Sequence, residues 1–182
     1  MIDATALTGT WTLDPAHTRI GFSARHAMVT KVRGNFEEFD GTAHVDGANP
    51  ANSHVQVTIQ AASINTNNKM RDDHLRTNDF LEVDKYPTIT FTSTKVEQLD
   101  EDNVRITGDL TIKATTRQIS FDFEFGGLAN DPMGNTRIGF EGQTSINRQD
   151  YGVAFSAPLE AGGVLVSDKV GIDVEISAVK SA

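Results

Sequence analysis

Cysteine is absent from the 182-residue chain, which excludes disulfides, catalytic thiolates and thiolate metal sites. Basic residues are also in deficit, because 16 Lys and Arg stand against 25 Asp and Glu, for a formal net charge of −9. The summed field of such a chain repels phosphate backbones and anionic headgroups. The composition therefore disfavours nucleic-acid binding and electrostatic docking to membranes. The chain also contains no apolar run long enough to cross a membrane as a helix.

The amino-terminal residues 1–11 (MIDATALTGTW) have neither the basic start nor the apolar stretch of a secretory signal. We therefore expect the protein to be cytoplasmic. Hydrophobic residues make up 38% and charged residues 23% of the chain, as in ordinary globular proteins. We expect one domain over residues 1–182, with its core at about residues 10–178.

Apolar and polar residues alternate along most of the chain, a pattern typical of half-buried β-strands. The apolar faces are Ile20, Phe22, Ala24, His26 and Met28; Val55, Val57, Ile59 and Ala61; Ile89, Phe91 and Ser93; Val104, Ile106, Gly108, Leu110 and Ile112; Ile119, Phe121, Phe123 and Phe125; Ile138, Phe140, Gly142, Thr144 and Ile146; and Val170, Ile172, Val174, Ile176 and Ala178. With shorter strands near residues 10–14 and 41–45, the pattern predicts an all-β fold of about eight or nine strands. Turn-forming residues at 100–103 and 130–135 indicate that neighbouring strands are antiparallel.

A long run of strands hides its edges either by closing into a barrel or by stacking as a sandwich, and alternation alone does not choose between the two. Residues 70–78 form the one stretch that reads well as a short helix, with Asn67 or Asn68 available as its N-cap. Leu75, Phe80 and Leu81 give this segment an apolar side. We expect that side to lie across an open end of a barrel.

The five histidines lack the two-residue or four-residue spacing that places two imidazoles on one face, so we expect no metal site. His26 is the exception worth following, because it shares the parity of an apolar face. It is either a hydrogen-bonded core residue or a polar contact for a ligand headgroup. In the polar segment 147–152, Arg148 and Asp150 are expected to form a structural ion pair that pins a loop.

Small residues recur on the apolar faces, at Ala24, Ala61, Gly108 and Gly142. In an eight-stranded barrel, trimmed inward side chains leave room for a ligand. A glycine inside a strand can equally mark a bend or a bulge. At Gly108 we expect ligand space.

Many short motifs in one order resemble the YceI-like family, which is known as polyisoprenoid-binding. They are residues 11–18 (WTLDPAHT) followed by Ile20, Phe22 and His26; then 34–36 (GNF), 62–66 (ASINT), 71–75 (RDDHL), 79–80 (DF), 86–91 (YPTITF), 108–112 (GDLTI) and 146–152 (INRQDYG). The resemblance covers roughly residues 10–178. Small departures occur at Thr18, Ala24, Leu81 and Tyr151, where the family usually has Ser, Val, Phe and Phe.

The resemblance implies an extended, lipocalin-like, eight-stranded antiparallel barrel that binds a polyisoprenoid, an isoprenoid quinone tail or a fatty-acid derivative. We expect no further cofactor and no catalytic residue, and a homodimer is a reasonable assembly. The expected ligand-binding residues are Phe22, Ala24, His26, Met28, Phe36, Val57, Ile59, Phe91, Ile106, Gly108, Phe121, Phe123, Phe140 and Ile146.

Two other functions remain open at this stage. One is an enzyme acting on a lipid-like substrate, with His17 or His26 as base and Asp14 or Asp150 as its partner. The other is a structural or stress-response module whose barrel is filled by its own side chains.

Overall fold

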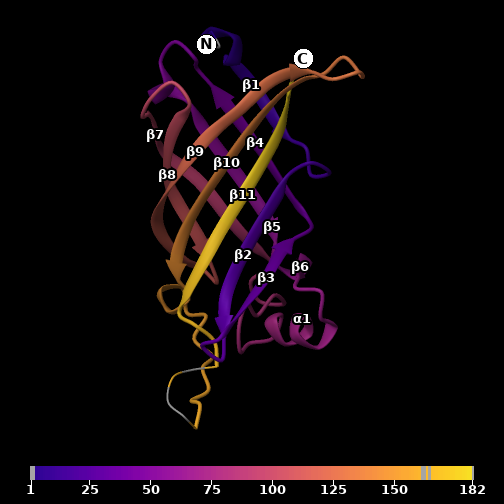
Figure 1. The fold of residues 1–182 in the computed structure, drawn as a ribbon, viewed down its shortest axis with the longest axis vertical. Helices are drawn as coiled ribbons and strands as arrows, with labels where there is room; N and C mark the ends of the chain where they lie inside the picture. The colour runs from indigo at the N-terminus through magenta and orange to yellow at the C-terminus, as the bar shows by residue number, and fades with distance from the viewer. Residues whose placement is uncertain (1–2, 161–162, 164, 182) are drawn as a thin grey trace.

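The computed structural model describes residues 3–160, 163 and 165–181, which wrap into a tall antiparallel barrel (Figure 1). The strands that follow one another round the wall are β1 (Gly9–Leu13), β4 (Phe39–Val45), β5 (His54–Gln60), β7 (Thr88–Gln98), β8 (Asn103–Ile112), β9 (Thr115–Asn130), β10 (Thr136–Asn147) and β11 (Lys169–Lys180). Pairing of β11 with β1 closes the ring. The predicted eight-stranded antiparallel barrel is confirmed, and the sandwich is excluded.

A second group of strands extends the wall at one end of the barrel. β2 (Arg19–His26) pairs with β11 beyond the point where β1 stops, and β3 (Thr30–Phe36) and β6 (Ile64–Asn65) continue from it. The sequence pattern predicts the first of these strands but not β3 as a separate strand. The two edges of β11 are thus occupied along most of its length, by β10 on one side and by β1 and β2 on the other.

The helical elements cap the barrel. The predicted helix is confirmed as α1 (Lys69–Leu75), and the Asn68 side chain caps it by accepting a hydrogen bond from the backbone N–H of Arg71 at 3.0 Å. Short 3₁₀ turns are η1 (Ala4–Leu7), η2 (Pro50–Asn52), η3 (Ala61–Ser63) and η4 (Arg148–Tyr151). Both termini lie at one end of the barrel and α1 at the other, as Figure 1 shows.

Trp11 packs at the point where the barrel closes. In the sheet it lies opposite Ala43 on β4 and Lys180 on β11, and its side chain is 0% exposed. The indole N–H donates to the carbonyl of Leu7 at 2.8 Å, so the polar atom of this buried ring is satisfied. One large side chain therefore joins η1, β4 and β11 at the seam.

Aromatic rings cover the backbone of two inward-facing glycines. Phe123 lies directly opposite Gly142, and a methyl group on Gly142 would be 2.5 Å from its ring. A methyl group on Gly108 would lie 2.6 Å from both Phe91 Cζ and the carbonyl oxygen of Thr92. The glycines therefore hold space for neighbouring rings, an arrangement that protects otherwise bare strand backbone.

We expect Gly108→Ala to destabilise the protein by about 1–3 kcal/mol, because the added methyl group forces the Phe91 ring or the strand backbone to move. Gly139→Ala is the matched control, since its methyl group would be 3.7 Å from the nearest atom, an ordinary contact. The control should stay within about 0.5 kcal/mol of wild type. Urea unfolding measures both variants, and equal stabilities would contradict the assignment of this space to Phe91.

Candidate functional site

The barrel encloses a cavity of about 1120 Å³ that runs along its axis. This volume lies just above the range of about 300–1,000 Å³ that is usual for small-molecule sites. Inward residues of all the wall strands contribute to its lining, and these residues are overwhelmingly aliphatic or aromatic. The barrel is hollow and apolar inside.

Wall residues confirm the hollow interior. In a barrel filled by its own side chains, mid-strand inward residues would be fully buried. Phe91, Ile106 and Ile172 instead remain partly accessible although their strands sit in the middle of a closed sheet. The filled-barrel alternative therefore does not fit this structure.

The structure brings most of the predicted ligand-binding residues together on the cavity wall: Phe22, Ala24, Phe36, Val57, Ile59, Phe91, Ile106, Phe121, Phe123, Phe140 and Ile146. Further lining residues that the prediction omitted include Leu13, Ile119, Phe125, Ile138, Val170, Ile172, Val174 and Ile176. The alternation already placed all of these except Leu13 on apolar faces. Contact with a ligand stays a prediction for every residue in both groups.

His26 and Met28 are exposed and lie outside the cavity wall, against the prediction. β2 ends at His26, and the chain then turns, with Ala27 and Met28 at φ of 51° and 65°. Alternation stops where the strand stops, so the inward parity of Phe22 and Ala24 does not extend to these two residues. His26 is therefore neither a core residue nor a headgroup contact inside the barrel.

Gly108 also departs from its predicted role. It faces inward, but the space beside it is filled by the Phe91 ring, so it does not provide room for a ligand. The room in the cavity comes from the closure of the ring at this strand number and from side chains such as Ala24.

The two ends of the cavity differ in polarity. At the η1 end its rim includes Asp3, Asp46, Glu101, Asp102 and Asn103. The α1 end is covered mainly by apolar side chains, among them Leu75, Phe80, Leu81, Val153 and Val166. The expectation that the segment after α1 lies across an end of the barrel is confirmed.

Arg148 is a buried cation at the covered end, and it is only 4% exposed. Its guanidinium donates to the carbonyl oxygens of Val153, Val166 and Ser167 at 2.7, 3.2 and 2.9 Å. Its carboxylate partner is Asp168, at 3.4 Å, so the predicted pairing with Asp150 is wrong. Burial lowers the pKa of Arg148, and Asp168 partly offsets this effect. As predicted, the arginine pins a loop, but it does so through carbonyl groups.

Tyr151 packs beside Arg148 and is 2% exposed. Its hydroxyl is buried without a hydrogen-bond partner in the described part of the chain. Burial of the ring raises the pKa of this hydroxyl. The α1 end of the cavity therefore combines the hydrogen-bonded guanidinium of Arg148 with a Tyr151 hydroxyl that has no hydrogen-bond partner among the described residues.

The YceI-like domain model matches residues 11–178, which is nearly the whole chain. The chain belongs to the YceI-like family. Among curated relatives of this YceI-like chain, the UPF0312 protein SAS2572 of Staphylococcus aureus is 37% identical over 169 residues, covering 92% of this chain and 94% of the relative.

Solved structures of similar fold include the YCEI protein of Campylobacter jejuni, at 36% identity and a TM-score of 0.75, covering 93% of this chain and 97% of that one. BcnA of Burkholderia cenocepacia superposes with a TM-score of 0.79 at 22% identity, over 91% and 98% of the two chains. A polyisoprenoid binding domain from Saccharophagus degradans gives 0.71 at 17% identity, over 94% and 98%. The last two likenesses concern the fold alone.

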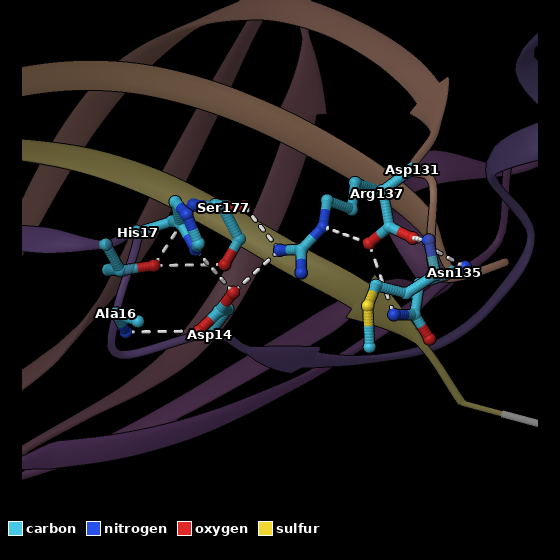
Figure 2. Close-up of polar contacts among 9 residues, drawn as sticks. Asp14, Ala16, His17, Asp131, Asn135, Arg137 and Ser177 are labelled. Carbon is cyan, nitrogen blue, oxygen red and sulfur yellow. Dashed lines mark hydrogen bonds and ion pairs between the residues drawn. The ribbon is translucent and has the colours of Figure 1, made fainter.

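A polar network lies on the outside of the YceI-like barrel, near the closing strands (Figure 2). Arg137 donates to Asp14 at 2.7 Å and to Asp131 at 2.7 Å, and His17 Nδ1 lies 2.8 Å from Asp14. Arg137, then His17, lowers the pKa of Asp14 to about 2. Hydrogen bonds from the Asn135 backbone and then from Arg137 lower the pKa of Asp131 to about 2.

The network contains His17 and Asp14, one of the base–carboxylate pairs that the enzymatic alternative allows. Neither residue lines the cavity, and the Asp14 carboxylate already accepts hydrogen bonds from Arg137 and from the backbone of Ala16. These contacts give the pair a structural role, because they join the β1–β2 loop, the β9–β10 turn and the barrel wall. The other candidate base, His26, is exposed at the end of β2. Among the described residues it forms no ion pair with Asp150.

The residues that the structure describes contain no cluster of three or more His, Asp or Glu side chains able to hold a metal ion. None of their helices is long and apolar enough to span a membrane.

Arg148→Leu should lower the free energy of unfolding by about 2–4 kcal/mol, because three carbonyl groups at the cavity floor lose their donor. Arg105→Leu is the control, since Arg105 pairs with Asp122 on the exposed face. Its stability should be close to that of wild type. Chemical unfolding measures both, and an Arg148 variant as stable as the control would refute the pinning role.

Arg137→Gln should return the pKa values of Asp14 and Asp131 toward the ordinary value of about 3.9. A carboxyl whose pKa is depressed in the folded state stabilises it above the unfolded pKa and loses this effect as the pH falls. The stability difference between wild type and variant should thus be greatest above about pH 5 and shrink toward pH 2. Carboxyl NMR titration and urea unfolding between these pH values test this, with Arg117→Gln as a control.

Proposed function

We propose that this YceI-like protein binds a long apolar lipid in its barrel and carries or sequesters it. The candidate ligands are a polyisoprenoid, an isoprenoid quinone tail or a fatty-acid derivative. The observation that carries the proposal is the apolar cavity of about 1120 Å³ along the barrel axis. The similar fold of a structure described as a polyisoprenoid binding domain supports the ligand class.

The energy available in such a cavity is sufficient for binding without specific polar contacts. Each buried methylene contributes about 0.8 kcal/mol, so ten contribute roughly 8 kcal/mol. This amount offsets the several kcal/mol lost when a flexible chain is immobilised. An apolar wall therefore supports affinity for a class of long chains.

The distribution of polar groups supports one orientation of the lipid. Carboxylate and amide groups surround the η1 end of the cavity, whereas the α1 end is covered by apolar side chains around Arg148, whose guanidinium is hydrogen-bonded to backbone carbonyls. A polar headgroup placed at the η1 rim keeps its hydration, while its tail occupies the dry interior. We propose this orientation for the bound lipid.

Organic extraction of the purified protein, followed by mass spectrometry, tests the proposal together with native mass spectrometry of the intact protein. We expect a long-chain apolar molecule at close to one per barrel. A barrel without stoichiometric lipid, which also fails to take up added prenyl or acyl chains, would refute it.

Ala24→Trp should weaken lipid binding, because the indole projects from the wall into the cavity. Exclusion of three methylenes loses about 2.4 kcal/mol, or roughly 60-fold in affinity. The melting temperature should change little, since the new ring enters open space. Ala154→Trp, at an exposed position, is the control and should bind like wild type. Unchanged binding by both variants would mean that the lipid does not occupy the cavity, which would contradict the proposal.

A further inference from the structure

The hairpin of β2 and β3 ends in an exposed apolar tip at the α1 end of the barrel (Figure 1). Residues 27–29 connect the two strands. Met28 is 56% and Val29 is 74% exposed. Isolated exposed apolar residues are common on proteins, so the tip is informative only together with the charges around it.

Basic side chains surround this tip. Arg25 and Lys31 are direct partners across the hairpin, and Arg33 lies opposite Ser23 on the same outward face. Like charges directly opposite each other repel, and none of the three forms an ion pair within the described ranges. Residues 15–36 contain no Asp or Glu, although the chain has 25 acidic residues.

The opposite end of the barrel is acidic. The cavity rim there carries Asp3, Asp46, Glu101 and Asp102. At physiological ionic strength, charges further apart than about 8 Å are largely screened from each other. A surface that approaches the β2–β3 tip therefore meets the local positive charge more than the net charge of −9.

We propose that the β2–β3 tip docks the barrel on an anionic lipid bilayer. Met28 and Val29 reach the boundary between headgroups and acyl chains, while Arg25, Lys31 and Arg33 contact the lipid phosphates. The acidic rim then faces away from the anionic surface. The net charge alone predicts repulsion from such membranes. The proposal differs because the basic residues are gathered at the tip and the acidic rim lies at the other end of the barrel.

The segment beside the tip fits this placement. The Ala27 N–H donates to Leu165 at 2.8 Å, and the Ser167 N–H donates to Arg25 at 3.0 Å. Within residues 151–168 the carboxylate side chains are Glu160 and Asp168, and Asp168 lies 3.4 Å from the Arg148 guanidinium. Val153 and Val166 of this segment cover the cavity end, so docking would bring that cover close to the bilayer, although docking itself does not depend on the proposed lipid cargo.

Sedimentation with vesicles tests the docking. At an ionic strength of about 0.1 M, we expect wild-type protein to bind vesicles of phosphatidylcholine with about 40% phosphatidylglycerol and not vesicles of phosphatidylcholine alone, with binding lost as salt rises further. Lys31→Gln should weaken binding about five-fold, the effect of one cation near an anionic surface. Lys95→Gln removes the same charge from an exposed lysine on β7 and should bind like wild type.

A second pair of variants tests the apolar part of the tip. Val29→Ser should also weaken binding, whereas Met133→Ser, at an 85% exposed position in the β9–β10 turn, should not. Equal binding to neutral and anionic vesicles, no binding to either, or equal losses in Lys31→Gln and Lys95→Gln would overturn the proposal. So would a concentration-dependent oligomer that Lys31→Gln dissociates in the absence of vesicle binding, because the tip would then contact a second copy of the chain. Lipid extracted from the same preparations reports the cavity function separately.

Discussion

Closure of the sheet through β11 is the constraint on which the rest of this structure depends. β11 hydrogen-bonds to β10 along one edge, and to β1 and β2 in succession along the other. Closure removes the free strand edges that an open sheet would expose. It also divides the side chains of every strand into an inward and an outward set, because successive residues point to opposite faces. The pairing of β1 with β11 at Trp11 therefore determines which side chains face the interior of the barrel.

Once the ring is closed, the inward side chains do not have to fill it. An eight-stranded ring is wide enough for either packed side chains or a ligand. Here the rings of Phe91 and Phe123 lie against glycine backbone on neighbouring strands, which draws aromatic volume toward the wall. The absence of a side chain at Gly108 and Gly142 leaves the space beside the wall that these two rings occupy. Small residues thus contribute to the cavity indirectly, by admitting rings.

Prediction from the sequence succeeded where one physical rule decided the outcome. Alternation over Val170, Ile172 and Val174 could be read directly, because strand geometry fixes which side chains point inward. The turn after His26 could not be read, since Ala27 and Met28 adopt left-handed conformations without the Gly, Asn or Asp that usually mark them.

Other features depended on neighbours that are distant in the sequence. The space beside Gly108 belongs to Phe91 on the adjoining strand, and Arg148 is held by Val153, Val166 and Ser167 across a long loop. A single strand pattern contains no information on such cross-strand contacts. For this reason the cavity lining was largely predictable, while the individual roles of Gly108 and Arg148 were not.

The apolar interior also limits how this protein can select a ligand. Hydrophobic burial is non-directional and scales with area, so a wall of Val, Ile and Phe distinguishes chains mainly by length and bulk. Polar groups at the rim add preference for a headgroup only where water does not already satisfy it. For the proposed lipid cargo, selection among lipids of similar length would then depend on which membrane the barrel meets. A docking surface beside the cavity end would supply that choice without any specific contact inside the barrel.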